Sequence, residues 1–324
     1  MHRIIRQTLI AAGLALLAAA PAAAQDYPTR PIRFLQGFAA GGNADLIARV
    51  LADELSKSLS QPVIVEARPG AGGNLAADQV AKSTPDGYTL LLVATSHVIS
   101  PAIYKSLPFD PVSGFDFITT VTEQPHFIVA NAKTSRFNTL AELVASAKAN
   151  PGKLTFGSAG VGTGQHLNGE LLNTITGAKM VHVPYRGDSA AVAGLLSGDV
   201  DFIVAPLAAV SSNIEAGMFR ALATTGGKPW PQLPNVPPVA SVVPEFGQSM
   251  PWTGIVTAHG TPKPIIDRLN ADLTRIIASP TVANRLREFG GEGSPSSPQQ
   301  MEGKVKSEIA RWTKVIETAG IPKQ

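Results

Sequence analysis

The pattern that most constrains this chain is an alternation of short apolar segments with longer amphipathic ones. Ile32 to Leu35 has the composition of a strand, and from Asp45 onward apolar residues recur at spacings of three and four, as on one face of a helix. Thr89 to Ala94 is a nearly continuous apolar run, typical of a strand buried on both faces. Strands that alternate with helices predict parallel sheets covered by helices, and therefore an α/β protein.

The alternation continues to the C-terminus. A helix is expected after Thr139, because Thr139 and Glu142 have the spacing of a capping box. The other expected strands are 63–65, 127–130, 154–156, 181–183, 200–204, 220–224 and 253–257, and the other expected helices are a short one after Asn74 and 165–174, 189–196, 211–216, 264–278, 280–289 and 301–318.

Length and composition predict two domains. A chain of 324 residues is long enough to divide into two domains, and Pro229 to Pro238 holds five prolines, which indicates a surface connection. The last three helices have little sheet of their own to cover, so we expect them to pack back on the first domain. The predicted domains are therefore residues 25–122 together with 227–324, and residues 123–226.

The N-terminus has the pattern of a secretory signal peptide, residues 1–24. Arg3 and Arg6 precede an apolar run that is too short to span a bilayer, and Ala22 and Ala24 offer a cleavage site. The chain contains no cysteine, which excludes disulfides, a thiol nucleophile and a lipid anchor on cysteine. We therefore expect an unanchored protein in a bacterial periplasm.

The charge balance argues against a nucleic-acid partner. Removing residues 1–24 takes away two of the 27 Lys and Arg residues and none of the 24 Asp and Glu residues, so the remainder is close to neutral. Basic clusters are absent and only 6% of the residues are aromatic, so the chain lacks the electrostatic and stacking features of a nucleic-acid binder.

Glycine-rich turns precede three of the expected helices: Gly41-Gly42-Asn43, Gly70 to Asn74, and Gly157 to Gly164. Glycine lets the backbone approach a ligand, while the unpaired N–H groups and positive dipole of a helix start favour an anion. A single such turn is better explained as a tight strand-to-helix connection. Turns from both domains that face one another would instead predict an anion site in a cleft.

Motifs of the common enzyme and cofactor classes are missing from the sequence. The turn at Gly160 reads G-x-G-x-G, and neither a phosphate-binding loop, nor G-x-S-x-G, nor H-E-x-x-H occurs. His166 and His182 are expected to be hydrogen-bonded structural residues, whereas His97 could line a cleft. We expect neither an enzyme nor a cofactor or metal.

The same turns carry a resemblance to a known family. Most of the chain resembles the solute receptors of tripartite tricarboxylate transporters, also called Bug receptors. The matching segments include Tyr27-Pro28, Arg68 to Asn74, Pro85 to Leu91, Gly157 to Gly160, His166 to Leu171 and Val181 to Gly187. The resemblance implies a two-lobed type II periplasmic binding protein fold that closes on an organic acid.

The resemblance also implies the ligand-binding residues. They are Phe38, Ala39, Ala40, Gly41 and Asn43 in the first loop, Ser96 in a further cleft loop, and Ser158, Ala159, Gly162 and Thr163 in the second lobe. Ala205, at the end of a second-lobe strand, stands where many family members have aspartate. Alanine there favours a purely acidic or apolar-bodied ligand over one with an ammonium or hydroxyl group.

Three functions remain open from these residues. The first is a monomeric receptor that delivers a small carboxylate to the permease subunits of a tripartite transporter. The second is a receptor whose closed form docks on a signalling partner. The third, an exported hydrolase, lacks the motifs that it would need.

Overall fold

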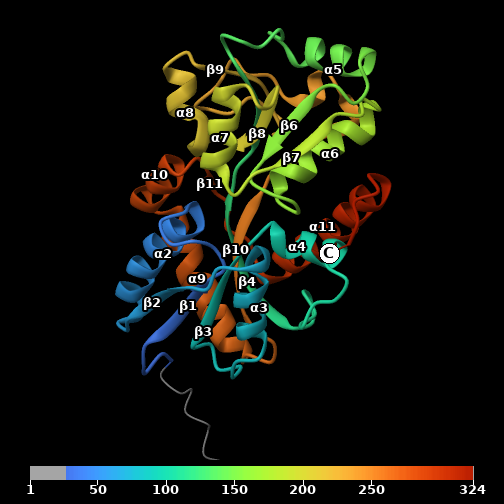
Figure 1. Ribbon diagram of the computed structural model, residues 1–324. Helices are drawn as coiled ribbons and strands as arrows, with labels where there is room; N and C mark the ends of the chain where they lie inside the picture. Colours follow the sequence, from blue (N-terminus) through green and yellow to red (C-terminus); the bar gives the residue numbers. More distant parts are fainter. Residues whose placement is uncertain (1–26, 324) are drawn as a thin grey trace, which may run out of the picture.

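A computed structural model describes residues 27–323, and the expected signal peptide lies outside them. The strands form two separate sheets, a six-stranded one of order β11-β4-β10-β3-β1-β2 and a five-stranded one of order β7-β6-β8-β5-β9 (Figure 1). The first contains β1 (Ile32–Gln36), β2 (Val63–Ala67), β3 (Thr89–Ala94), β4 (Phe115–Glu123), β10 (Trp252–Ala258) and β11 (Glu292–Gly293). The second contains β5 (His126–Asn131), β6 (Thr155–Ser158), β7 (Val181–Pro184), β8 (Phe202–Pro206) and β9 (Phe219–Thr224).

Helices cover both faces of each sheet. Around the six-stranded sheet lie α2 (Asn43–Leu59), α3 (Asn74–Ala81), α4 (Ser96–Ile103), α9 (Lys263–Ala278), α10 (Pro280–Glu288) and α11 (Pro298–Thr318). Around the five-stranded sheet lie α5 (Leu140–Ala149), α6 (Gly164–Thr176), α7 (Asp188–Ser197) and α8 (Leu207–Glu215). We call the two sheets with these helices the first and the second lobe. This arrangement is the α/β fold expected from the sequence.

Both sheets are mixed, which corrects the simple expectation of parallel sheets. β1 is parallel to β2 and β3, and β6 is parallel to β7 and β8. β10, however, lies antiparallel between β3 and β4, and β5 lies antiparallel between β8 and β9. β5 and β10 are each the first strand after a chain crossing, and a strand that is entered without a crossover helix can run antiparallel to its neighbours.

Two strands and one α-helix were missed from the sequence: β4, the two-residue β11, and α4. β4 is rich in threonine, and Thr119 and Thr120 are buried with hydroxyls bonded to Ser296 and Ser294, so buried polar residues interrupt the apolar pattern of the strand. α4 is short and contains Pro101. Proline lacks the N–H group that a helix interior donates, so the sequence argued against a helix at this place.

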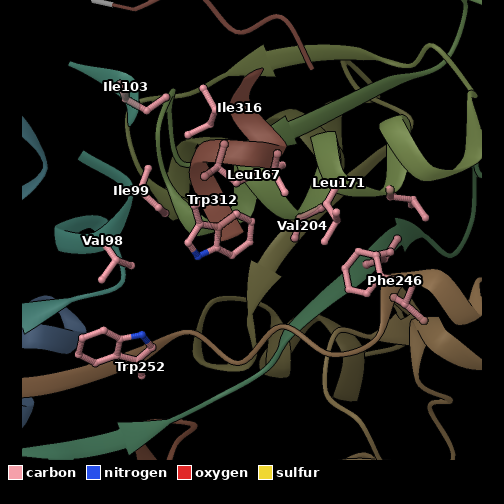
Figure 2. Close-up of a cluster of buried hydrophobic side chains, with 14 of the residues drawn as sticks. Val98, Ile99, Ile103, Leu167, Leu171, Val204, Phe246, Trp252, Trp312 and Ile316 are labelled. Carbon is pink, nitrogen blue, oxygen red and sulfur yellow. The ribbon is translucent and has the colours of Figure 1, made fainter. Parts of the chain in front are cut away.

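The apolar core joins the two lobes. One cluster of buried side chains includes Ile99 of α4, Leu171 of α6 and Trp312 of α11, so it contains helices of both lobes (Figure 2). Trp312 is 1% exposed and its indole Nε1 donates a hydrogen bond to Glu308. Since α11 contacts both α4 and α6, the lobes share packing as well as chain crossings.

Candidate functional site

The carboxyl ends of the parallel strands of both sheets lie on the side of the chain crossing. β4 runs in the direction of β3, because both are antiparallel to β10, and it ends at Glu123 just before the crossing. Across the crossing, His126 begins β5 and pairs with Pro206 at the end of antiparallel β8. The helices that follow these strands therefore begin at the junction of the lobes, where open α/β sheets bind ligands (Figure 1).

The first-lobe loop after β1 is held by side chains from its two ends. Gln36 Oε1 accepts a hydrogen bond from the N–H of Phe38 (2.8 Å), and Asp45 Oδ2 accepts one from the N–H of Gly41 (2.9 Å). Ala39 and Ala40 are exposed between these anchors. The predicted residues of this loop thus offer mainly backbone groups to a ligand.

Asp45 lies in the first turn of α2 and anchors the loop before it. It is 2% exposed, and Gly42 occupies the cap position. Burial by itself would raise its pKa, but hydrogen bonds from Arg49 and from the N–H of Gly41 hold the pKa below the ordinary value. Asp45 is therefore an ionised anchor for the loop before α2.

Ser96 and Phe38 are brought together from separate loops. Ser96 Oγ donates to the carbonyl of Gly72 (2.6 Å), and both residues line a cavity of about 10 Å³ that also touches Phe38 and Asn74. Asn74 is 6% exposed, and its Nδ2 has no partner among the described residues. The cavity has room for about one water molecule, which Asn74 would bind as donor.

Asn43 lies at the edge of the crossing. Its Nδ2 is 3.4 Å from Oε1 of Gln124, the residue directly after β4, and its buried Oδ1 has no partner within residues 27–323. Asn43 therefore links the start of α2 to the segment that joins the lobes. It also brings an unsatisfied acceptor to the site.

The second-lobe loop uses its hydroxyls to fix its own shape. Thr163 Oγ1 donates to the carbonyl of Gly160 (2.7 Å) and accepts from the N–H of His166, which caps α6. Ser158 is fully buried and bonds to Gly160 and to His182 Nε2 (2.7 Å). Within the described chain, no protein acceptor binds the N–H groups of Ala159, Val161, Gly164 or Gln165. Backbone donors, rather than the predicted hydroxyls, are therefore the groups left for an anion.

Two stacked histidine rings, His166 and His182, contact this loop by hydrogen bonds to Gly162 and Ser158. The rings of His166 and His182 stack at 4.0 Å, and His166 Nδ1 accepts a hydrogen bond from the N–H of Gly162. Burial lowers the pKa of His166 to about 3 and that of His182 to about 4. Both rings are neutral near pH 7, so His166 can serve as an acceptor. His97 packs between Phe109 and Phe115 inside the first lobe, and it also lines the small cavity beside Phe38 and Ser96.

The loops of the two lobes meet near α4. A Cβ placed on Gly162 would lie 3.6 Å from Cγ2 of Ile103 in α4, and one on Gly164 would lie 3.1 Å from His126. The second-lobe loop therefore faces the first lobe and the crossing. Ala205 differs from the other predicted residues, because it is 2% exposed and belongs to the apolar cluster between the five-stranded sheet and helices α7 and α8.

Sequence reasoning overlooked Gln165 and Asp188, which lie beside the second-lobe loop. Gln165 Nε2 donates to Asp188 Oδ1 (3.1 Å), joining the first turns of α6 and α7. The acidic residue directly after Gly187, at the start of an expected helix, was the available signal. The hydrogen bond between Asp188 and Gln165 depends on how α6 and α7 are placed in space, so no local sequence pattern predicts it.

Two α/β lobes whose helix starts meet at a chain crossing define a periplasmic binding protein. The solved periplasmic binding protein BugD superposes with a TM-score of 0.79 at 32% identity, over 92% of this chain and all of BugD. The R. palustris protein Rpa4515, solved with adipate, superposes with a TM-score of 0.82 at 33% identity, over 92% of this chain and all of that one.

The sequence comparisons assign the family. The family model described as the tripartite tricarboxylate transporter family receptor matches residues 47–321, so the chain belongs to that family. The protein BugT of Bordetella pertussis is 36% identical over 305 residues, which cover 93% of each chain. The expected Bug-receptor membership and two-lobed fold are thus confirmed. None of the helices within residues 27–323 combines the length and apolar character needed to cross a bilayer.

Proposed function

We propose that this receptor captures a small carboxylate between its lobes and delivers it to the permease subunits of a tripartite transporter. The observation that carries the proposal is the meeting of helix starts from both lobes at the crossing. There, the N–H groups of Ala159, Val161, Gly164 and Gln165 have no acceptor within residues 27–323. Such groups favour an anion over a neutral or cationic solute. The adipate held by the related Rpa4515 supports an organic acid as ligand.

The proposal includes the setting in which the receptor works. The protein acts in the periplasm as a monomer, after removal of residues 1–24, and performs no chemistry on its ligand. We assign ligand binding to the predicted residues and to three further backbone N–H groups. The predicted residues are Phe38, Ala39, Ala40, Gly41, Asn43, Ser96, Ser158, Ala159, Gly162, Thr163 and Ala205, and the further N–H groups are those of Val161, Gly164 and Gln165. Residues 25–122 with 227–324, and residues 123–226, are the domains that close on the ligand.

The burial of Ala205 limits what it contributes. If Ala205 contacted the ligand, a purely acidic or apolar-bodied ligand would be favoured. The side chain of Ala205, however, lies in an apolar cluster near the end of β8. Aspartate at this position would put a charge among apolar side chains, so Ala205→Asp would reduce stability as well as binding. A substitution at Ala205 would therefore not separate a loss of ligand binding from a loss of stability.

Thermal unfolding with a panel of solutes tests the proposal. A ligand present at 100 times its Kd stabilises the folded state by about 2.7 kcal/mol, which raises the melting temperature measurably. We expect aliphatic or aromatic mono-, di- or tricarboxylates to produce this shift at neutral pH, with amines and sugars as controls. A shift with amines or sugars and with no acid would contradict the proposal. Light scattering would check the monomer.

A further inference from the structure

The pair Asp188 and Gln165 bridges the edge of the second-lobe sheet. A Cβ on Gly169 of α6 would collide with Phe156, and a Cβ on Gly194 of α7 would collide with Tyr185, whose ring covers Gly157. Phe156 and Gly157 are consecutive in β6 and point to opposite faces, so α6 and α7 lie on opposite sides of the sheet. A hydrogen bond between their first turns must therefore cross the carboxyl ends of the strands.

This crossing lies against the proposed second-lobe loop. The N–H of Tyr185 donates to the carbonyl of Ser158 (3.0 Å), and the N–H of Gly187 donates to the carbonyl of Ala159 (3.2 Å). Asp188 follows directly in sequence, and Gln165 is the neighbour of Gly164 at the start of α6. The carboxylate of Asp188 is thus fixed beside the backbone donors that we assign to the ligand.

Asp188 has no positively charged partner among residues 27–323. Its carboxylate forms no ion pair with any basic side chain in the part of the chain that the structure describes, and Gln165 is its side-chain hydrogen-bond partner. Asp188 is partly buried, and burial raises its pKa, while the hydrogen bond from Gln165 opposes this rise. A carboxylate at an anion site repels a second acid group and favours a hydrogen-bond donor.

We propose that Asp188, oriented by Gln165, accepts a hydrogen bond from a hydroxyl or ammonium group of the bound acid and so selects substituted acids over unsubstituted ones. The inference rests on the proposed function, because it assigns a second role within the same site. Ala205 provides no such acceptor, and Asp188 supplies it from the neighbouring helix. When an unsubstituted acid is bound in the closed cleft, the carboxylate of Asp188 has no hydrogen-bond donor from the ligand. Leaving this acceptor unpaired lowers the affinity for the unsubstituted acid.

Matched sets of acids test this selection by calorimetry. Propionate, lactate and alanine share one carbon chain, and succinate, malate and aspartate share another, with hydrogen, hydroxyl or ammonium at the same carbon. In the set that the wild-type protein binds, we expect a hydroxy or amino acid to bind at least about tenfold more tightly than the unsubstituted acid. Equal or tighter binding of the unsubstituted acid would overturn the inference.

Two substitutions separate charge from hydrogen bonding. Asp188→Asn removes the charge but keeps an oxygen acceptor, so it should lose the preference for ammonium and retain part of that for hydroxyl. Asp188→Ala should lose both preferences while still binding the unsubstituted acid. The control is Glu215→Gln, which removes an exposed carboxylate at the far end of α8 and should leave every ratio unchanged.

The outcomes distinguish this inference from the proposed function. Circular dichroism and melting temperature establish that each variant folds. If Asp188→Ala does not fold, Asp188→Asn, which preserves the side-chain shape, still tests the inference. Wild-type preferences retained in a folded Asp188→Asn or Asp188→Ala protein would overturn the role of Asp188 and leave carboxylate capture intact. If no carboxylate in any panel binds the wild-type protein, the proposed function itself fails.

Discussion

Thr163 has two roles at the start of α6. Its Oγ1 accepts from the N–H of His166 and donates to the carbonyl of Gly160, so the residue caps the helix and shapes the loop before it. Ser158 is similarly engaged with Gly160 and His182. At the residue scale, the predicted hydroxyl donors act through the backbone groups that they position.

We expect Thr163→Ala to lower the free energy of unfolding by about 1 kcal/mol, because an N-cap hydrogen bond is lost. Binding of the identified acid should also weaken, since the N–H groups of the loop are then less well positioned. Thr163→Ser keeps the oxygen and should preserve both properties. Chemical unfolding and calorimetry check these values, and an unchanged stability in Thr163→Ala would show that the cap contributes little.

At the scale of elements, α6 approaches β6 through a glycine. A Cβ on Gly169 would lie 2.2 Å from Cε2 of Phe156, so the helix rests on the aromatic ring without a side chain between them. This close approach sets the position of the N-terminus of α6, where the proposed ligand groups begin. Packing of one helix on one strand is thus part of the site geometry.

Gly169→Ala should push α6 away from the sheet, lower stability by roughly 1–3 kcal/mol and weaken ligand binding. The matched control is Gly303→Ala in α11, where a Cβ would meet no atom within 4 Å. There, alanine should raise stability by about 0.5–1 kcal/mol through its higher helix propensity. Equal effects of the two changes in thermal unfolding would contradict this account of the packing.

Across the part of the molecule that the structure describes, three buried histidines and the partly buried His182 link stability to pH. Burial lowers the pKa of His97 and His182 to about 4, and that of His126 and His166 to about 3. The unfolded chain takes up these protons near pH 6.5, whereas the folded chain resists them. Stability is therefore fully present above about pH 6.5 and falls as the pH decreases towards about 4.

Each buried histidine contributes a slope of up to about 1.4 kcal/mol per pH unit over this range. Melting temperatures measured from pH 8 to pH 4.5 should hold steady and then fall below about pH 6.5. His97→Phe should reduce the slope, because it removes one of these buried imidazoles. Glu170 and Asp188, whose pKa burial raises, offset part of the loss at the acid end. A flat profile between pH 6.5 and 5 would refute this role of the histidines.

The sequence alone determined the order of most helices and strands and the places where glycine-rich turns open helices. These features follow from side-chain periodicity and turn chemistry, which act between residues close in the chain. Thr139, for example, caps α5 as its local pattern predicted. The loop residues near Gly41 and Gly162 could be named in advance for the same reason, with the resemblance to the family supplying their role.

Only the tertiary structure decided which side chains meet. β4 and α4 depend on partners far along the chain, the hydroxyls of Ser158 and Thr163 turn inward, and Ala205 enters an apolar cluster. Asp188 reaches Gln165 because α6 and α7 begin at one sheet edge from opposite faces. Such contacts depend on how separate elements are placed in space, so neither periodicity nor local motifs could specify them.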